Sequence, residues 1–148
     1  MQEPAPSLAR PSGTLDHIAM AAMRCSALLM ESGARSKVVQ EFAAAATRAM
    51  GAEFHGFRIG YASLAITVGH DGGTVTRMIA FGTPGVNHRL DQALRALARR
   101  AQAEGITVEA FSAEITRLQK ETPRYAPLVT ATCRPETLRV GPIRRKHE

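Results

Sequence analysis

The sequence predicts an α+β domain with two N-terminal helices, a small antiparallel β-sheet of about three strands, and two C-terminal helices. Two observations carry this prediction. Apolar residues recur every three or four positions near both ends of the chain, whereas they alternate in its middle. The 148 residues are 45% hydrophobic and include no Trp, which indicates one domain with an aliphatic, alanine-rich core.

The first helix is expected from Thr14 to about Glu31. Thr14 would serve as N-cap, and Asp16 in the first turn would suit the positive end of the helix dipole. Gly33 is the expected stop, with a positive φ. One apolar stripe follows from the spacing of Leu15, Ile18, Ala22, Cys25 and Leu29.

A second helix is expected between Ser36, its cap, and Gly51, which ends it. Its apolar face is expected to consist of Val38, Phe42, Ala45 and Ala49.

Three short strands are expected next, in "AEFHGFR", "YASLAITVG" and "TVTRMIAFG". In the second, Leu64, Ile66 and Val68 share one face. The "HDGG" stretch predicts a hairpin turn between the last two strands. Gly56 and Gly60 weaken the first strand, which favours a bulge or an edge position there.

Two helices complete the predicted order. The first follows the loop "GTPGVN", with Asn87 as N-cap, Asp91 near the positive helix end, and leucines along one side. The second starts at Thr107, and Pro123 blocks its continuation. Its expected apolar stripe is Val108, Phe111, Ile115 and Leu118.

The net charge of +6 is not by itself a nucleic-acid signal. Half of it comes from the segment that starts at Arg134, which has no interleaved aromatic residues and is expected to be a solvated tail. A nucleic-acid or acidic-membrane binder acting through this tail is the less favoured interpretation. Cys25 and Cys133 form neither a disulfide framework nor a metal-ligand spacing, which is typical of a reducing compartment.

No combination of chemical groups in the sequence amounts to an active site. The five histidines lack metal-ligand spacing, and the glycine loops fit no phosphate-binding motif. His88 and Asp91 could form a small polar site, although capping is the preferred interpretation. Ser32 beside Glu31 offers a hydroxyl without an evident base, so a hydrolase is a minor alternative. No catalytic, cofactor-binding or metal-binding residue is therefore assigned.

Four segments in order resemble the amino-terminal domain of the threonine/serine exporter family. They are "RCSALLMESGARSKVVQEF", "ATRAMGAE", "VTRMIAFGTPGVNHRLDQ" and "ITRLQKETPRYAPLV". The resemblance covers about residues 18–128. The family-like positions, of unknown role, are Glu31, Gly33, Gly85, Asn87, Arg124 and Tyr125.

The resemblance implies a cytoplasmic domain, at the inner face of the bacterial inner membrane, that gates or assembles the membrane part in amino-acid efflux. It implies no enzymatic activity and no cofactor. The expected partner is a membrane-embedded exporter half, with the apolar faces of the first two helices docking on it. A homo-oligomer stays open, and no nucleic-acid partner is expected. A dicarboxylate (succinate-type) exporter subunit that docks on a separate membrane component is the alternative.

The expected organisation is a disordered lead over residues 1–13, the exporter-like domain over 14–127, and a basic, disordered tail over 128–148. In the family a membrane helix begins just after the "PRY" element. Here five basic residues, two acids and two prolines in 133–148 break that pattern. The expectation is a truncated or frame-shifted exporter fragment, with a natural stand-alone domain as the rival.

Overall fold

The computed structural model describes residues 12–122, which form four helices and one three-stranded sheet in the order α α β β β α α. The expected lead and tail fall largely outside these residues. The elements are α1 (Ser12–Glu31), α2 (Ser36–Ala49), β1 (Glu53–Ile59), β2 (Ser63–His70), β3 (Gly73–Ala80), α3 (His88–Glu104) and α4 (Val108–Glu121). The predicted α+β class and the order of its elements are confirmed.

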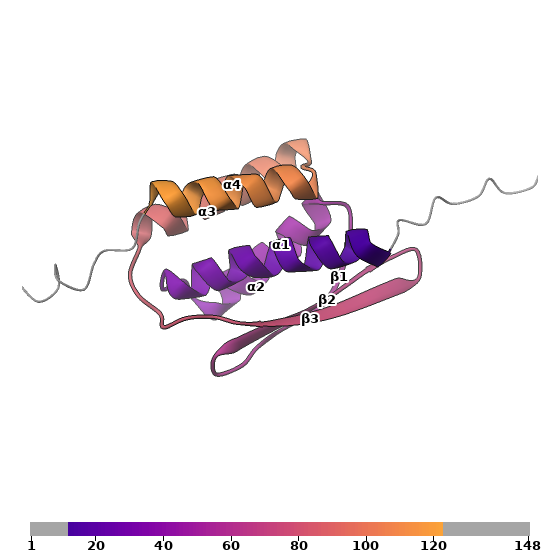
Figure 1. The fold of residues 1–148 in the computed structure, drawn as a ribbon, viewed down its shortest axis with the longest axis horizontal. Coiled ribbons are helices and arrows are strands. Elements are labelled where there is room, and N and C mark those ends of the chain that lie inside the picture. The colour runs from indigo at the N-terminus through magenta and orange to yellow at the C-terminus, as the bar shows by residue number, and fades with distance from the viewer. Residues whose placement is uncertain (1–11, 123–148) are drawn as a thin grey trace, which may run out of the picture.

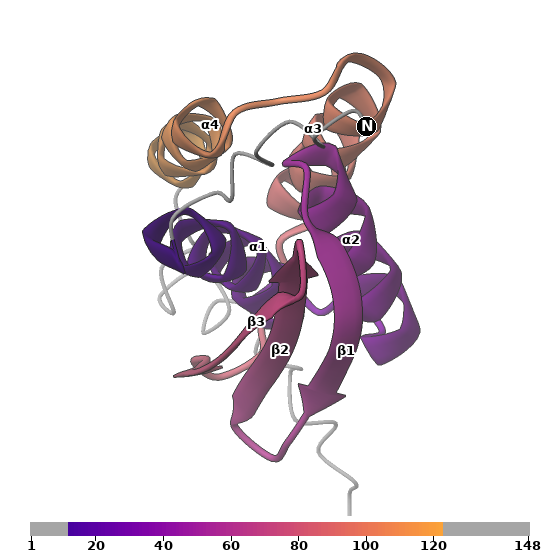
Figure 2. The ribbon, with the colours of Figure 1, turned by 90° about the vertical axis from the view of Figure 1, so that its right-hand side faces the viewer.

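The elements stack in three layers (Figures 1 and 2). The sheet is the first layer, α1 and α2 cover one of its faces, and α3 and α4 lie on the far side of these two helices. Figure 2 shows α4 above α1 and α3 above α2. The other face of the sheet is covered by no helix or strand of the described part of the chain.

Helix α1 is the centre of the molecule and contacts α2, α3, α4, β2 and β3. Between residues 21 and 29, Arg24 is the only exposed residue. An alanine-rich helix suits this position, because small side chains let neighbouring helices approach from several directions. The predicted stripe of Leu15, Ile18, Ala22, Cys25 and Leu29 is buried as expected.

The antiparallel sheet has β2 in its middle, in the order β1-β2-β3. Leu64, Ile66 and Val68 point toward the helices and are fully buried, as predicted. The hairpin turn is also confirmed, because Asp71 and Gly72 both have positive φ, 48° and 79°, between the paired residues His70 and Gly73.

Strand β1 confirms both expectations for the first strand. It is an edge strand of the sheet. Its pairing with β2 shifts register between Phe54 and Gly56, which is a β-bulge.

The predicted start of α1 is wrong. The helix begins at Ser12, so Thr14 lies inside it and Asp16 is beyond the first turn. Gly13 costs a helix only about 1 kcal/mol, and nothing else in this stretch prevents an earlier start. Asp16 instead forms an ion pair with Arg77 of β3, a contact between distant segments that local capping rules do not describe.

The start and the buried face of α2 also differ from the prediction. Arg35 is the N-cap, in extended conformation and without a side-chain hydrogen bond, and Ser36 is already helical. The buried set is Val39, Phe42, Ala43, Ala44, Ala46 and Thr47. Because α1 and β1 pack on this side, the face is turned by about one residue from the predicted stripe. Val38 and Ala45 therefore line a groove between α2 and α3.

The last two helices agree with the prediction. Asn87 caps α3 and Thr107 caps α4, each accepting a backbone N–H three residues ahead. Phe111, Ile115 and Leu118 are buried, and Val108 is half-buried. Among residues 12–122, no helix is both long and apolar enough to span a bilayer.

Candidate functional site

The candidate site is built where α1 ends and α3 begins, two places more than fifty residues apart in the sequence. Helix α1 ends in a Schellman motif: Ala34 N–H donates to the Leu29 carbonyl at 3.0 Å, and Gly33 N–H donates to the Met30 carbonyl at 3.0 Å. Gly33 has φ 87°, as expected for this motif.

The loop that precedes α3 is hydrogen-bonded to this helix end. The Gly85 N–H donates to the Glu31 carbonyl oxygen at 2.8 Å, and the Gly82 N–H donates to the Glu31 carboxylate at 2.6 Å. The Asn87 N–H reaches the Ser32 carbonyl at 3.4 Å. Glu31 therefore holds the loop through both its backbone and its side chain.

Asn87 carries the connection from this junction into α3. Its backbone bonds to Ser32, while its side-chain oxygen accepts the Leu90 N–H at 3.1 Å. The residue is buried, so both interactions are shielded from water. Asn87 thus caps α3 with its side chain and, through its backbone N–H, fixes where that helix starts relative to the end of α1.

Four of the six family-like positions meet at this junction: Glu31, Gly33, Gly85 and Asn87. The sequence alone did not predict that Glu31 contacts Gly85, because all three strands lie between these residues along the chain. The other two positions, Arg124 and Tyr125, lie outside the described residues.

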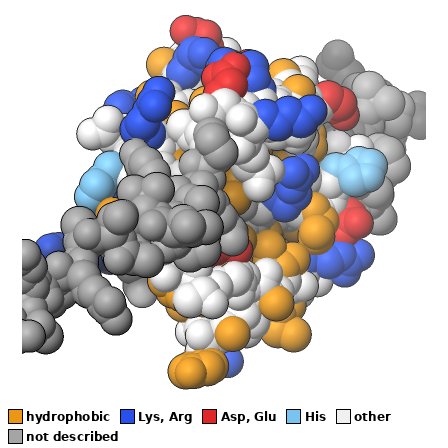
Figure 3. Space-filling model, turned by 60° about the vertical axis from the view of Figure 1, so that its left-hand side comes forward, with side chains coloured by type: hydrophobic (Ala, Val, Ile, Leu, Met, Phe, Trp, Pro, Cys, Tyr) orange, Lys and Arg blue, Asp and Glu red, His pale blue; other side chains and the backbone are white. Residues whose placement is uncertain are grey.

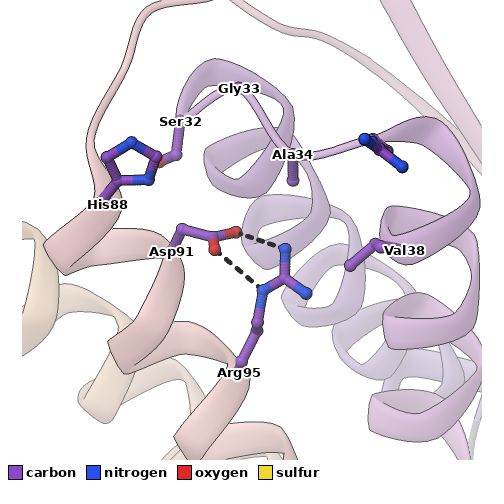
Figure 4. Close-up of a pocket in the computed structure, with 8 residues that line it drawn as sticks. Ser32, Gly33, Ala34, Val38, His88, Asp91 and Arg95 are labelled. Carbon is purple, nitrogen blue, oxygen red and sulfur yellow. Dashed lines mark hydrogen bonds and ion pairs between the residues drawn. The ribbon is translucent and has the colours of Figure 1, made fainter.

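A pocket of about 400 Å³ opens beside the junction (Figure 4). One wall is the turn between α1 and α2 with the start of α2, and the other wall is the first turns of α3. Its lining residues are Ser32, Gly33, Ala34, Arg35, Val38, His88, Asp91 and Arg95.

A fixed ion pair forms the α3 wall of this pocket. The Arg95 Nε and Nη2 atoms donate to the two Asp91 carboxylate oxygens, at 2.9 and 3.1 Å. The Asp91 side chain is only 16% exposed, which strengthens a bidentate pair relative to one in open solvent. Figure 4 shows the Arg95 guanidinium extending from α3 toward Ala34 and Val38.

Sequence reasoning found Ser32, His88 and Asp91 but missed Arg35, Val38 and Arg95 as pocket residues. The signal for Arg95 was present, because an acid followed four residues later by an arginine on a helix indicates an ion pair. Arg35 and Val38 carried no such signal, since their place depends on how α2 is turned against α3.

The pocket does not assemble a hydrolytic site. The Ser32 hydroxyl donates to the Leu28 carbonyl at 2.7 Å, so its proton points back into α1 and not toward His88. A nucleophilic serine needs a base within hydrogen-bond reach of that proton. Within residues 12–122, no cluster of three or more His, Cys, Asp or Glu side chains could hold a metal ion.

Cys25 is not a reactive group of this site. It is fully buried in α1, and this burial raises the pKa of its thiol far above the usual value, so the thiolate does not form near neutral pH.

Comparison with known proteins agrees with the resemblance seen in the sequence. The ThrE family model, described as "Putative threonine/serine exporter", matches residues 20–134, which is well over half of the chain. No curated protein and no solved structure matches the chain significantly.

Proposed function

Because the chain belongs to the threonine/serine exporter family, we propose that residues 12–122 form a cytoplasmic module that docks on the membrane-embedded half of an exporter and assembles or gates it. The family is one of transporters, so the chain is related to solute export and not to a known enzyme class. The module itself would not conduct solute. Its role would be to bind the part that does.

The observation that carries the proposal is the junction between α1 and α3. Backbone hydrogen bonds from Gly85 and Asn87 to the end of α1 lock the polar pocket to the central helix. Helix α4 packs on the same central helix, and the Arg24 guanidinium donates to the Gln119 side chain at 3.3 Å. The pocket, α1 and α4 are therefore joined into one body, which is what a gating or assembly module would require.

The experiment is a binding measurement with a defined membrane half. The probe is a member of this family that lacks the segment matching residues 20–134, held in nanodiscs of zwitterionic lipid. Empty nanodiscs of the same lipid are the control. We expect saturable binding of the chain to the loaded nanodiscs only. Equal binding to both, or binding to neither, would contradict the proposal.

The solute is addressed by a second measurement on the same nanodisc partner, reconstituted into zwitterionic proteoliposomes. Efflux of labelled threonine, serine and succinate is compared with and without the chain. A change for threonine and serine supports amino-acid export, whereas a change for succinate alone assigns the chain to the dicarboxylate alternative.

A further inference from the structure

Three connecting segments of the fold gather at one end of the molecule, the end at which α4 also finishes. The 32–35 turn, the 82–87 loop and the 60–62 turn meet there, joined by hydrogen bonds from Gly82 to Glu31 and from Phe81 to Ala62. Helix α4 also ends at this side, because it runs in the same direction as α1 (Figure 1). We call this region, with the adjoining end of the sheet, the exit end.

The exit end carries the exposed large hydrophobic side chains of the described structure. Tyr61 is 104% exposed in the β1–β2 turn and Val86 is 69% exposed in the loop before α3. Met78 is 70% exposed and pairs with Ala65, which in turn pairs with Arg58 of β1. Met78, Ala65 and Arg58 form a row across the open face of the sheet, next to the Tyr61 turn. Figure 3 shows hydrophobic side chains gathered at the lower edge of this side.

The acids of the exit end each have a partner within the described structure: Glu31 accepts from Gly82, Asp91 pairs with Arg95, and Glu121 pairs with Arg117 at 2.9 Å on the surface.

The cations of this end are more available. Arg35, Arg58 and Arg89 are exposed and form no ion pair with any residue in the 12–122 range.

The opposite end is richer in acids. Asp71 lies in the β2–β3 turn, Glu53 starts β1, and Glu104 and Glu109 flank the α3–α4 connection. Arg48, in the last turn of α2, is an exposed cation at this end. An anionic surface is therefore attracted more strongly by the exit end than by the opposite end.

The geometry points to an anionic lipid surface as the partner of the exit end. An exposed aromatic ring with a polar tip, two further apolar side chains and unpaired arginines are the chemistry that binds the headgroup region of a bilayer. The proposal rests on the proposed function only in expecting a bilayer near the module. The arginines would contact lipid phosphates, while Tyr61, Met78 and Val86 would enter the interface.

A second copy of this chain suits the exit end less well. The open sheet face spans three strands of up to eight residues, which is about 400 Å² from strand spacing and rise. A stable dimer needs about 800 Å² from each partner. Two such faces would also bring Arg58 of each copy toward the other.

The test uses a fluorescent probe that the sequence makes unambiguous. The full chain has no Trp, so Tyr61→Trp introduces a single reporter at the exit end. Thr74→Trp is the matched control. Thr74 is exposed on the same open face of the sheet as Met78, but at the opposite end, beside the β2–β3 turn. Both variants are titrated with phosphatidylglycerol-containing vesicles and with pure phosphatidylcholine vesicles, without any exporter.

We expect a blue shift and quenching by doxyl-labelled lipid for Tyr61→Trp with the anionic vesicles only, and neither for Thr74→Trp. The basic segment from Arg134 onward could tether the chain to the same vesicles. Tethering alone would leave Tyr61→Trp unshifted, which overturns the proposal. Equal shifts for the two variants, or for the two kinds of vesicle, overturn it as well.

Charge reversal provides the second arm of the test. Arg58→Glu and Arg89→Glu should each lower partitioning into anionic vesicles by at least about five-fold. This is the factor expected from losing the attraction of one cation to such a surface. Arg99→Glu makes the same charge change at an exposed position of α3 farther from the exit end and should have a smaller effect. An equal loss for Arg99→Glu would overturn the assignment of this end. Because these vesicles contain no exporter and the nanodiscs contain no anionic lipid, either proposal can fail alone.

Discussion

The carbonyl oxygen of Gly85 lies 2.8 Å from the position that a Cβ atom on Gly33 would occupy. These two glycines bring the end of α1 against the loop before α3 at a distance that no other residue at position 33 allows. Since the contact is with backbone and not with a flexible side chain, the loop would have to move to make room. The pocket beside the junction depends on this approach.

We expect Gly33→Ala to destabilise the fold by about 2–4 kcal/mol, from the strain of a positive φ together with the clash on Gly85. Gly72→Ala is the matched control, because Gly72 has φ 79° and open space around its Cβ position. That variant should be destabilised only by the strain of the positive φ, which is about 1 kcal/mol. The free energies of unfolding come from urea denaturation. Equal losses would mean that the Gly33–Gly85 approach does not limit stability.

Removing the cap of α3 should cost stability as well. Asn87→Ala deletes the oxygen that accepts the Leu90 N–H, and we expect a loss of about 1–2 kcal/mol for a buried cap. Asn87→Asp retains an oxygen acceptor at this position and should recover most of the loss. Thermal and urea unfolding measure both variants. A loss for Asn87→Asp as large as that for Asn87→Ala would show that the side-chain amide group, and not the cap, is what matters.

Cys25 should be inert in the folded protein. In a Cys133→Ser background, a disulfide reagent such as DTNB should react with Cys25 only through unfolding of the chain. Burial raises the pKa of this thiol, so its rate should stay suppressed between about pH 7 and 9, where an ordinary thiol with pKa about 8.5 accelerates. The same chain in denaturant is the control. A rate in the folded chain that follows ordinary thiol ionisation would contradict the buried position of Cys25.

Glu114 makes a pH-dependent contribution to the free energy of unfolding, and the direction of its pKa shift gives the sign. Hydrogen bonds and charge from Arg117 and Arg100 lower the pKa of its carboxyl below the usual 4.5. Its contribution is therefore full above pH 4.5 and is lost as the pH falls through the lower folded value. The side chain is 29% exposed, so we expect less than about 1 kcal/mol from the interaction.

The measurement compares the wild-type chain with Glu114→Gln by urea denaturation at neutral and at acidic pH. The wild type should be the more stable at neutral pH, and the difference should shrink toward zero in acid and in high salt. Glu109→Gln, an exposed acid in the first turn of the same helix, is the control for helix-dipole effects. A difference that persists in acid would contradict the assigned interaction.

The sequence by itself determined the class of fold, the order of its elements and several of their boundaries. Gly33 ends α1, Asn87 begins α3, and Asp71–Gly72 form the hairpin turn, because each of these signals acts within a few residues and needs no partner from elsewhere. The segments around the same residues also sufficed to indicate the family.

Tertiary structure alone decided how those elements meet. The Asp16–Arg77 ion pair, the rotation of α2 that leaves Val38 in a pocket, and the contact of Gly33 with Gly85 all involve segments distant in the chain. Local propensity contains no information on such pairings, since they follow from packing a whole layer of helices at once. The exposed Tyr61 of the exit end, and its arginines that pair with no acid between residues 12 and 122, could be recognised only once their neighbours were in place.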